Sequence, residues 1–358
     1  MSGACDDCLA RSWLLERVSG HLAVARSRIQ ILLGLDDEPL VAAVAPGQRR
    51  EILGELARFS AEKARRRAET SELELLCRCQ PRYPPRLRAL AAPPAVLHVA
   101  GGLERFLSAC ADEPVAVVGA RRASSYGLEM ARALGRGLSA SGLGVVSGMA
   151  LGVDSAAHLG AVEVHGPTIA VLPGPADQAY PASRRQMLRS ILRTGSAISE
   201  LPPGSSVRSW SFPARNRTMA GLAALTIVVE ATARSGSLVT AELALAMGRP
   251  VGAVPGRTTS PLAEGTNELL ARGAHVVRHA GDALDLLFGA GERSAPDLRP
   301  PVSAHHAVVL AALAAGEAPG GAFAAAGLSP AEGLAALSAL ELAGRVRRGA
   351  GGRFTVVP

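Results

Sequence analysis

Residues 115–127 read VAVVGARRASSYG, an apolar β-branched run that ends in a glycine, two arginines and two serines. The run predicts a buried strand, and the helical pattern that follows over 128–139 predicts a helix after a short loop. Six further apolar runs repeat this order: GVVSG (144–148), TIAVLPG (168–174), AISE (197–200), LTIVVE (225–230), PVGAVPG (250–256) and AHVV (274–277). Strands that alternate with helices imply a parallel sheet covered on both faces. We therefore expect an α/β protein with a Rossmann-like, doubly wound, mostly parallel sheet.

The flanking segments predict two smaller domains. Apolar residues recur at helical spacing over 14–35 and 50–69, and residues 289–303 are rich in Gly, Pro and charge. Three apolar helical segments follow the linker, the third opened by Ser329 as a cap, and RVRRGAGGRFTVVP ends the chain as a hairpin turned at 349–352. We expect a helical N-terminal domain (1–80), a Rossmann-like domain (81–288), a linker (289–303) and a winged-helix-like domain (304–358).

The first loop argues against a dinucleotide site. A dinucleotide fingerprint requires G-x-G-x-x-G, and its second glycine lets the backbone approach the pyrophosphate. Here Arg121 stands two positions after Gly119 and would block that approach. Arg121, Arg122 and Ser124 instead suit a phosphate outside the loop, near a helix N-terminus. The alternative is a plain tight turn with an exposed arginine.

Other loops place similar groups at the same edge, because the carboxyl ends of parallel strands meet there. The expected anion-binding residues in these loops are Ser147, Gly148, Arg184, Arg185, Arg234, Ser235 and Gly236. Asp154 is expected to cap the helix that starts at 155, and His158 to make a structural hydrogen bond, so neither is given a catalytic role.

Residues 208–217 interleave cations with aromatic rings in a chain that is only 3% aromatic. Alternating arginines and rings are typical of single-strand binding, in which phosphates meet cations and bases stack on rings. The members of this cluster are Arg208, Trp210, Phe212, Arg215 and Arg217. The alternative is that the two rings belong to the core and the arginines to salt bridges.

Composition favours a polyanionic partner. The formal net charge is +7, and all cations but Lys63 are arginines, although an Arg bias also reflects genome composition. The chain has no apolar run of the roughly 18 residues that span a bilayer, and acidic residues stand near Met1 where a signal peptide carries basic ones. We expect a cytoplasmic protein with no membrane partner.

Four cysteines flank the expected helical domain, as Cys5-x2-Cys8 and Cys77-x-Cys79. Four thiolates can form a tetrahedral zinc site that joins its two ends. The alternative is that these cysteines are buried or free thiols.

The ordered motifs closely resemble the DNA-processing protein A (DprA/Smf) family over about residues 80–288. The matching pieces are VVGARRASSYG, VVSGMALGVDSAAH, TIAVLPG, YP, SELPPG, FPARNRTMAGLA, EATARSGSLVTAELA, VPG and GTNELLARGA. The resemblance implies a recombination mediator that binds single-stranded DNA, protects it and loads RecA recombinase during natural transformation. It also implies a homodimer through the Rossmann-like domain, no catalytic turnover and no required cofactor. By motif, it assigns DNA contacts to Arg121, to Arg184 or Arg185, to Arg208, and to Arg215 and Asn216.

Two rival functions follow from the same residues. The fold and the GTNE segment favour a nucleotide-processing enzyme of the phosphoribohydrolase type, and Glu200 and Glu230 end strands at the ligand edge. That enzyme needs a compact P-G-G-x-G-T-x-x-E loop, whereas eight residues separate Gly256 from Gly265 here. The other rival reads duplex DNA through the winged helix, but its third helix has few side chains suited to base edges.

Overall fold

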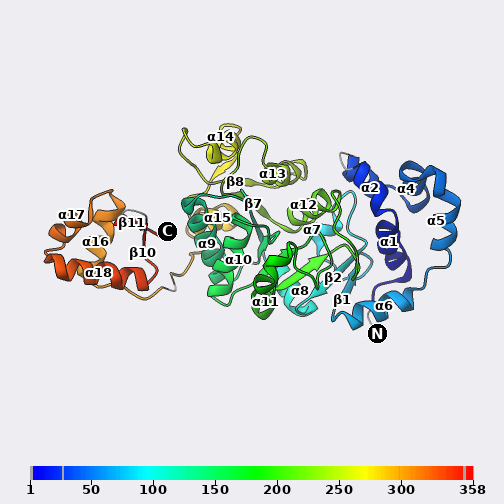
Figure 1. Cartoon of the computed structure of the whole chain (residues 1–358), viewed down its shortest axis with the longest axis horizontal. Coiled ribbons are helices and arrows are strands. Elements are labelled where there is room, and N and C mark those ends of the chain that lie inside the picture. Colours follow the sequence, from blue (N-terminus) through cyan, green and yellow to red (C-terminus); the bar gives the residue numbers. More distant parts are fainter. Residues whose placement is uncertain (1–2, 26–27, 298, 350–351, 358) are drawn as a thin grey trace. The chain divides into compact units, whose positions relative to one another are not determined.

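The computed structural model describes residues 3–25, 28–297, 299–349 and 352–357. The chain divides into two compact units, residues 1–295 and 296–358 (Figure 1). The N-terminal helices and the sheet therefore belong to one compact unit, with no break at the boundary expected near residue 80. The second boundary falls inside the expected linker.

A nine-stranded sheet organises the first unit, in the order β1-β2-β6-β5-β4-β3-β7-β8-β9. Its strands are β1 (Glu74–Cys77), β2 (Val96–Ala100), β3 (Val115–Val118), β4 (Val145–Ser147), β5 (Thr168–Val171), β6 (Ser196–Ser199), β7 (Leu225–Val228), β8 (Val251–Ala253) and β9 (His275–Val276). Strands β3–β9 pair in parallel, and all seven apolar runs of the sequence form them. The sheet is therefore mostly parallel, as predicted.

The two antiparallel strands at one end of the sheet, β1 and β2, were not predicted. β2 pairs antiparallel with β6, and β1 pairs antiparallel with β2. β1 lies inside the segment that was expected to be helical. This four-residue strand follows a charged helix and is too short to show an alternation of its own.

Helices cover both faces of the sheet because successive strand residues point to opposite sides. Ala116 and Val118 of β3 join one core with α7 (Pro85–Arg88), α8 (Leu103–Cys110), α12 (Ser211–Leu222), α13 (Gly236–Ala246) and α14 (Glu264–Ala271). Val115 and Val117 join the opposite core with α9 (Ser125–Ala140), α10 (Val153–Glu163) and α15 (Ala280–Phe288). α11 (Arg185–Thr194) packs against β5 and β6.

Within the first unit, the N-terminal helices pack against α12 of the sheet region. They are α1 (Asp6–Arg17), α2 (Ser19–Val24), α3 (Ile29–Leu33), α4 (Asp37–Val44), α5 (Arg49–Leu56) and α6 (Ala61–Thr70). Trp210 and Ala214 share a core with Leu14 and Leu22. The Trp210 indole N–H donates to the Ser19 hydroxyl at 2.8 Å. Trp210 thus belongs to the core, as the alternative interpretation of the 208–217 cluster held.

The second unit contains α16 (Ala304–Ala314), α17 (Pro319–Ala325), α18 (Pro330–Leu342) and the antiparallel pair β10 (Val346–Arg348) and β11 (Phe354–Val356). Its core includes Leu313, Phe323 and Leu340. Ser329 caps α18 in a capping box with Glu332, as predicted from the sequence. Within the predicted turn over 349–352, residues 350–351 lie outside the described part of the chain.

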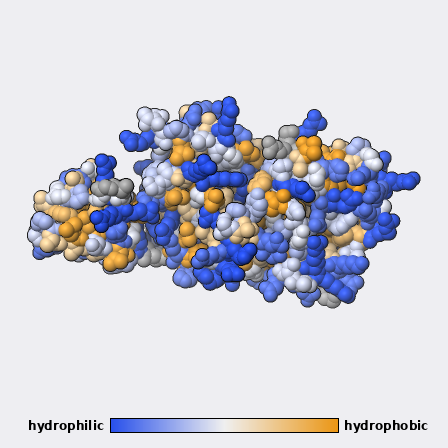
Figure 2. Space-filling view, viewed as in Figure 1, coloured by the Kyte–Doolittle hydropathy of each residue, from blue (hydrophilic) through white to orange (hydrophobic). Residues whose placement is uncertain are grey.

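The apolar helices among the described residues include α13 and α16. No single helix there is both long and apolar enough to cross a bilayer; α17 and α18 satisfy the length and composition criteria only as a pair, with a bend of 104° between them. In Figure 2, hydrophilic side chains are interspersed among smaller hydrophobic patches on the face in view.

Candidate nucleic-acid interface

The strand order reverses direction at β3, which lies between β4 and β7. In doubly wound sheets ligands bind at such a switch point, outside the carboxyl ends of the strands. A pocket of about 380 Å³ lies there and is lined by the loops that follow β3 and β7, by α12, and by the start of α13. Its lining includes eight residues that the sequence predicted: Gly119, Arg121, Arg122, Phe212, Arg215, Asn216, Ser235 and Gly236.

The loop after β3 is held by backbone contacts. The Ala120 N–H donates to the Glu230 carbonyl at 2.7 Å, and the Val153 N–H donates to the Ala120 carbonyl at 3.2 Å. A Cβ at Gly119 would lie 2.7 Å from Val153 Cγ2 and 2.9 Å from the Glu230 carbonyl oxygen, so a side chain there would force these segments apart.

Arg121 and Arg122 are both exposed at this pocket. Among the described residues, neither forms a salt bridge with an acidic side chain, so both guanidinium groups are available to an external anion. An unpaired, exposed arginine at a switch point suits forked contact with a phosphate.

Aromatic rings lie beside this cation. The Arg121 guanidinium carbon lies 5.8 Å from the centre of the Phe212 ring, and Tyr180 meets the same ring edge-on with 5.6 Å between centres. Tyr180 is 41% exposed and Phe212 is half-buried. The pocket rim therefore combines a cation with rings on which bases can stack.

Arg215 forms a buried wall of the pocket. Its Nη1 lies 3.8 Å from the Asp154 carboxylate and 3.8 Å from Met219 Sδ, and its Nε has no partner. Burial raises the pKa of the Asp154 carboxyl, while Arg215 and two backbone N–H donors oppose that rise. A Cβ on Gly148 would lie 1.3 Å from Arg215 Nη1, so Gly148 makes room for this side chain rather than for a ligand.

The N-terminus of α13 faces the pocket through Ser235, Gly236 and Ser237. The Ser235 hydroxyl accepts from the Ser237 N–H at 3.4 Å, and Asn216 donates to the Gly236 carbonyl at 3.4 Å. The positive end of this helix adds to the attraction that Arg121 exerts on an anion.

Four predicted arginines lie outside the pocket lining: Arg184, Arg185, Arg208 and Arg234. Arg185, Arg208 and Arg234 are exposed, and Arg184 is half-buried with an unpaired Nε. Arg184 ends a short 3-10 turn (Ala182–Arg184) just after Tyr180, the ring that touches Phe212. All four arginines remain predicted DNA contacts.

Three other predicted contacts have internal partners instead. Ser124 caps α9 and donates its hydroxyl to Glu230 at 2.6 Å, and the Ser147 hydroxyl is fully buried and donates to the Val117 carbonyl. Arg217 is 4% exposed and pairs with Glu200. We therefore do not include Ser124, Ser147 and Arg217 in the interface, because their polar groups bind partners inside the protein. Gly148 is not included either, because Arg215 fills the space beside it.

Glu200 and Glu230, the two carboxylates that an enzyme could use for proton transfer, also have internal hydrogen-bond partners. Glu200 accepts from Arg217 and Thr218, and Glu230 accepts from the Ser124 hydroxyl and N–H. Two carboxylates used this way are poor candidates for proton transfer to a substrate.

Two other predictions from this region have different outcomes. His158 is buried, and its Nδ1 lies 2.7 Å from the Thr168 hydroxyl, which confirms its structural hydrogen bond. Asp154 is not the N-cap of α10, as we expected; Gly152 is, and the Asp154 carboxylate accepts from the N–H groups of Gly148 and Ala150.

The structure does not assemble the site that a phosphoribohydrolase-type enzyme would need, because Glu268 lies away from the switch-point pocket. The Asn267 amide makes paired hydrogen bonds with the Gly256 backbone, and the Glu268 carboxylate pairs with Arg272 on the exposed side of α14. Neither Gly256 nor Glu268 lines the switch-point pocket.

Sequence reasoning did not assign several lining residues: Ala150, Met219, Thr232, Ser237, Thr240 and Leu262. Thr232 and Ser237 stand within the EATARSGS stretch that had already been recognised as a loop. Leu262 comes from a separate 3-10 turn (Pro261–Ala263), and no pattern in the sequence links that turn to the pocket.

Comparison with known proteins is consistent with this geometry. The family model for DNA recombination-mediator protein A matches residues 74–288. A DNA processing protein from Mycobacterium tuberculosis is 40% identical over 215 residues, which are 60% of this chain and 55% of the relative. The chain thus spans about half the length of the curated relatives it first matches.

Two solved structures share the fold. The X-ray structure of DNA processing protein A from Streptococcus pneumoniae has a TM-score of 0.64 at 30% identity, over 78% of this chain and 96% of that one. A structure of DNA processing protein A from Helicobacter pylori, described for its single-stranded DNA binding mode, has a TM-score of 0.54 at 29% identity. The match covers 61% of this chain and 97% of that one. The matched family region contains the whole switch-point pocket, and the chain therefore belongs to the DNA recombination-mediator protein A family.

Proposed function

We propose that this chain binds single-stranded DNA at the switch-point pocket and acts without catalytic turnover. One observation carries the proposal: unpaired Arg121 lies against Phe212 at the carboxyl edge of the sheet, and Tyr180 meets the same ring edge-on. A cation beside stacking rings matches the backbone and bases of an unpaired strand, and a duplex hides its bases from such rings. The H. pylori relative is described as binding single-stranded DNA, which supports the same assignment.

Family membership supports a wider role, which we propose as well. As a recombination mediator, the chain would protect incoming or exposed single strands and load RecA recombinase onto them in natural transformation or recombination. It would act in the cytoplasm as a homodimer formed through the Rossmann-like domain. The second unit (296–358) would be a winged-helix-like domain that does not read duplex DNA. α18 supports this last point, because its exposed side includes Leu334 and Leu342.

A fluorescence-anisotropy titration tests the proposal. Labelled oligo-dT and a duplex of equal length are titrated with the full chain at two salt concentrations. We expect tighter binding to oligo-dT, with an affinity that falls steeply as salt rises because counterions are released from the phosphates. Equal or tighter binding to the duplex would overturn the proposal.

A further inference from the structure

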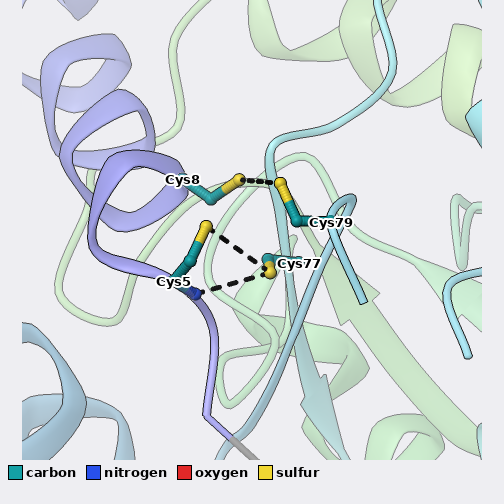
Figure 3. A group of neighbouring side chains, drawn as sticks. All are labelled: Cys5, Cys8, Cys77 and Cys79. Atoms are coloured by element: carbon teal, nitrogen blue, oxygen red, sulfur yellow. Dashed lines mark hydrogen bonds between the residues drawn. The ribbon is translucent and has the colours of Figure 1, made fainter. Parts of the chain in front are cut away.

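Four cysteines from distant parts of the chain meet in one cluster (Figure 3). Cys5 precedes α1 and Cys8 lies in its first turn, while Cys77 ends β1 and Cys79 follows in the next turn. Their four sulfur atoms all lie within 4.8 Å of one another. The N-terminal segment and the edge strand of the sheet thus present their thiols to a common centre.

The sulfur spacing fits a single metal ion. Around one Zn²⁺ with Zn–S bonds of about 2.3 Å, the edges of a tetrahedron of thiolates are about 3.8 Å long. Here Cys8 Sγ lies 3.7 Å from Cys79 Sγ, and Cys77 Sγ lies 3.9 Å from Cys5 Sγ. In a [4Fe–4S] cluster each thiolate binds a different iron, and in a [2Fe–2S] cluster the four thiolates bind two irons in pairs, so some thiolates lie farther apart than around one ion.

Hydrogen bonds and turns hold the four cysteines in place around this centre. The Cys5 N–H donates to Cys77 Sγ at 3.4 Å, and the Cys77 N–H donates to the Gln80 side-chain oxygen at 2.8 Å, which fixes the turn between the ligands. Cys5 and Cys8 stand three residues apart at the N-terminus of the twelve-residue helix α1, so both come from one helical turn. Backbone donors and fixed turns of this kind orient ligands around a metal.

We propose that Cys5, Cys8, Cys77 and Cys79 bind one Zn²⁺ in a closed structural site. All four coordination positions are filled by the protein, so the ion has no open position for water or substrate. Cys79 is exposed and gives the metal a path of entry, whereas Cys8 and Cys77 are buried.

The ion would fasten the helical region to the sheet. The metal link from α1 to β1 closes the segment between residues 8 and 77, which contains most of α1 and the five helices α2–α6. α1 also contacts the chain just after β6, where the Ser12 hydroxyl donates to the Glu200 carbonyl at 3.3 Å, and it places Leu14 in the core around Trp210. Loss of the metal should therefore loosen the region that packs on α12, the helix that carries Arg215.

Metal analysis of the full chain, purified without a polyhistidine tag, tests the site. We expect one zinc per chain, released as four thiols are titrated with a mercurial reagent. Cys79→Ser should lose the ion, and cobalt substituted into the wild-type chain should give the intense visible bands of a tetrahedral thiolate site. Cys110→Ala is the matched control, because Cys110 lies on α8 outside the cluster and should leave the zinc content at one per chain.

A thermal melt with and without chelator gives a second reading. Chelation should lower the melting temperature of the wild-type chain and of Cys110→Ala, and leave that of Cys79→Ser unchanged. A folded wild-type chain that contains no zinc and has all five thiols free would overturn the proposal. Full zinc retention in Cys79→Ser, or iron in place of zinc, would overturn it as well.

Discussion

Replacing Arg121 with alanine tests the role of the pocket rim. The side chain is exposed and lies against Phe212, and no acidic partner of its own is seen in the described part of the chain. Its removal should therefore leave the fold unchanged and take away one phosphate contact and one neighbour of a stacking ring. The loss should appear in DNA binding and not in unfolding.

The size of the effect follows from the kind of contact. A hydrogen bond to a charged group contributes about 1.5–3 kcal/mol, and an exposed side chain belongs at the lower end. We therefore expect Arg121→Ala to weaken oligo-dT binding about tenfold. One phosphate contact fewer should also reduce the slope of log K against log salt by about 0.7.

Arg272→Ala is the matched control. Arg272 is exposed on α14 and pairs with Glu268, so this variant loses the same unit of charge away from the pocket. Anisotropy titrations of both variants over a salt series separate a local contact from net charge. If Arg121→Ala and Arg272→Ala show the same affinity and the same slope, the rim assignment is wrong.

Three further predictions concern buried groups. Arg217→Ala should lower the free energy of unfolding by about 3–5 kcal/mol, because it leaves the Glu200 carboxylate buried without its partner; an unchanged urea midpoint would contradict the pair. Gly148→Ala should destabilise the chain by about 1–3 kcal/mol and weaken oligo-dT binding, since its Cβ would displace Arg215; wild-type values in both assays would refute this. Burial lowers the pKa of His158 to about 4, below its ordinary value of 6.5, so protons bind first to the unfolded chain as pH falls. The stability that neutral His158 contributes is complete above about pH 6.5 and falls by about 3 kcal/mol towards pH 4. In urea unfolding, the stability of His158→Gln should therefore decline less steeply as the pH falls. An identical decline in the variant and the wild-type chain would exclude the effect.

The parallel strands β3–β8 could be predicted because each is a short, mostly apolar run buried on both faces. VAVVG and LTIVVE show this plainly, and they became β3 and β7. The antiparallel edge could not be predicted in the same way. β1 is too short to show a period, and its pairing depends on β2, which is a contact between distant segments.

The candidate site was predictable to the level of loops, because the carboxyl ends of parallel strands must meet. Which side chains in those loops turn inward was not predictable. Arg215 and Arg217 are two residues apart on one helix, yet Arg215 lines the pocket and Arg217 pairs with Glu200. Trp210 and Phe212 separate in the same way, one into the core and the other to the pocket, because the N-terminal helices cover Trp210.

Hydrogen–deuterium exchange with and without oligo-dT tests the central claim most directly, because it locates the strand on the chain. The claim predicts slower exchange on binding in the loops over 119–125 and 232–237, and no change in α14 (Glu264–Ala271). Protection confined to α14 or to the second unit (296–358), with both loops unchanged, would contradict it.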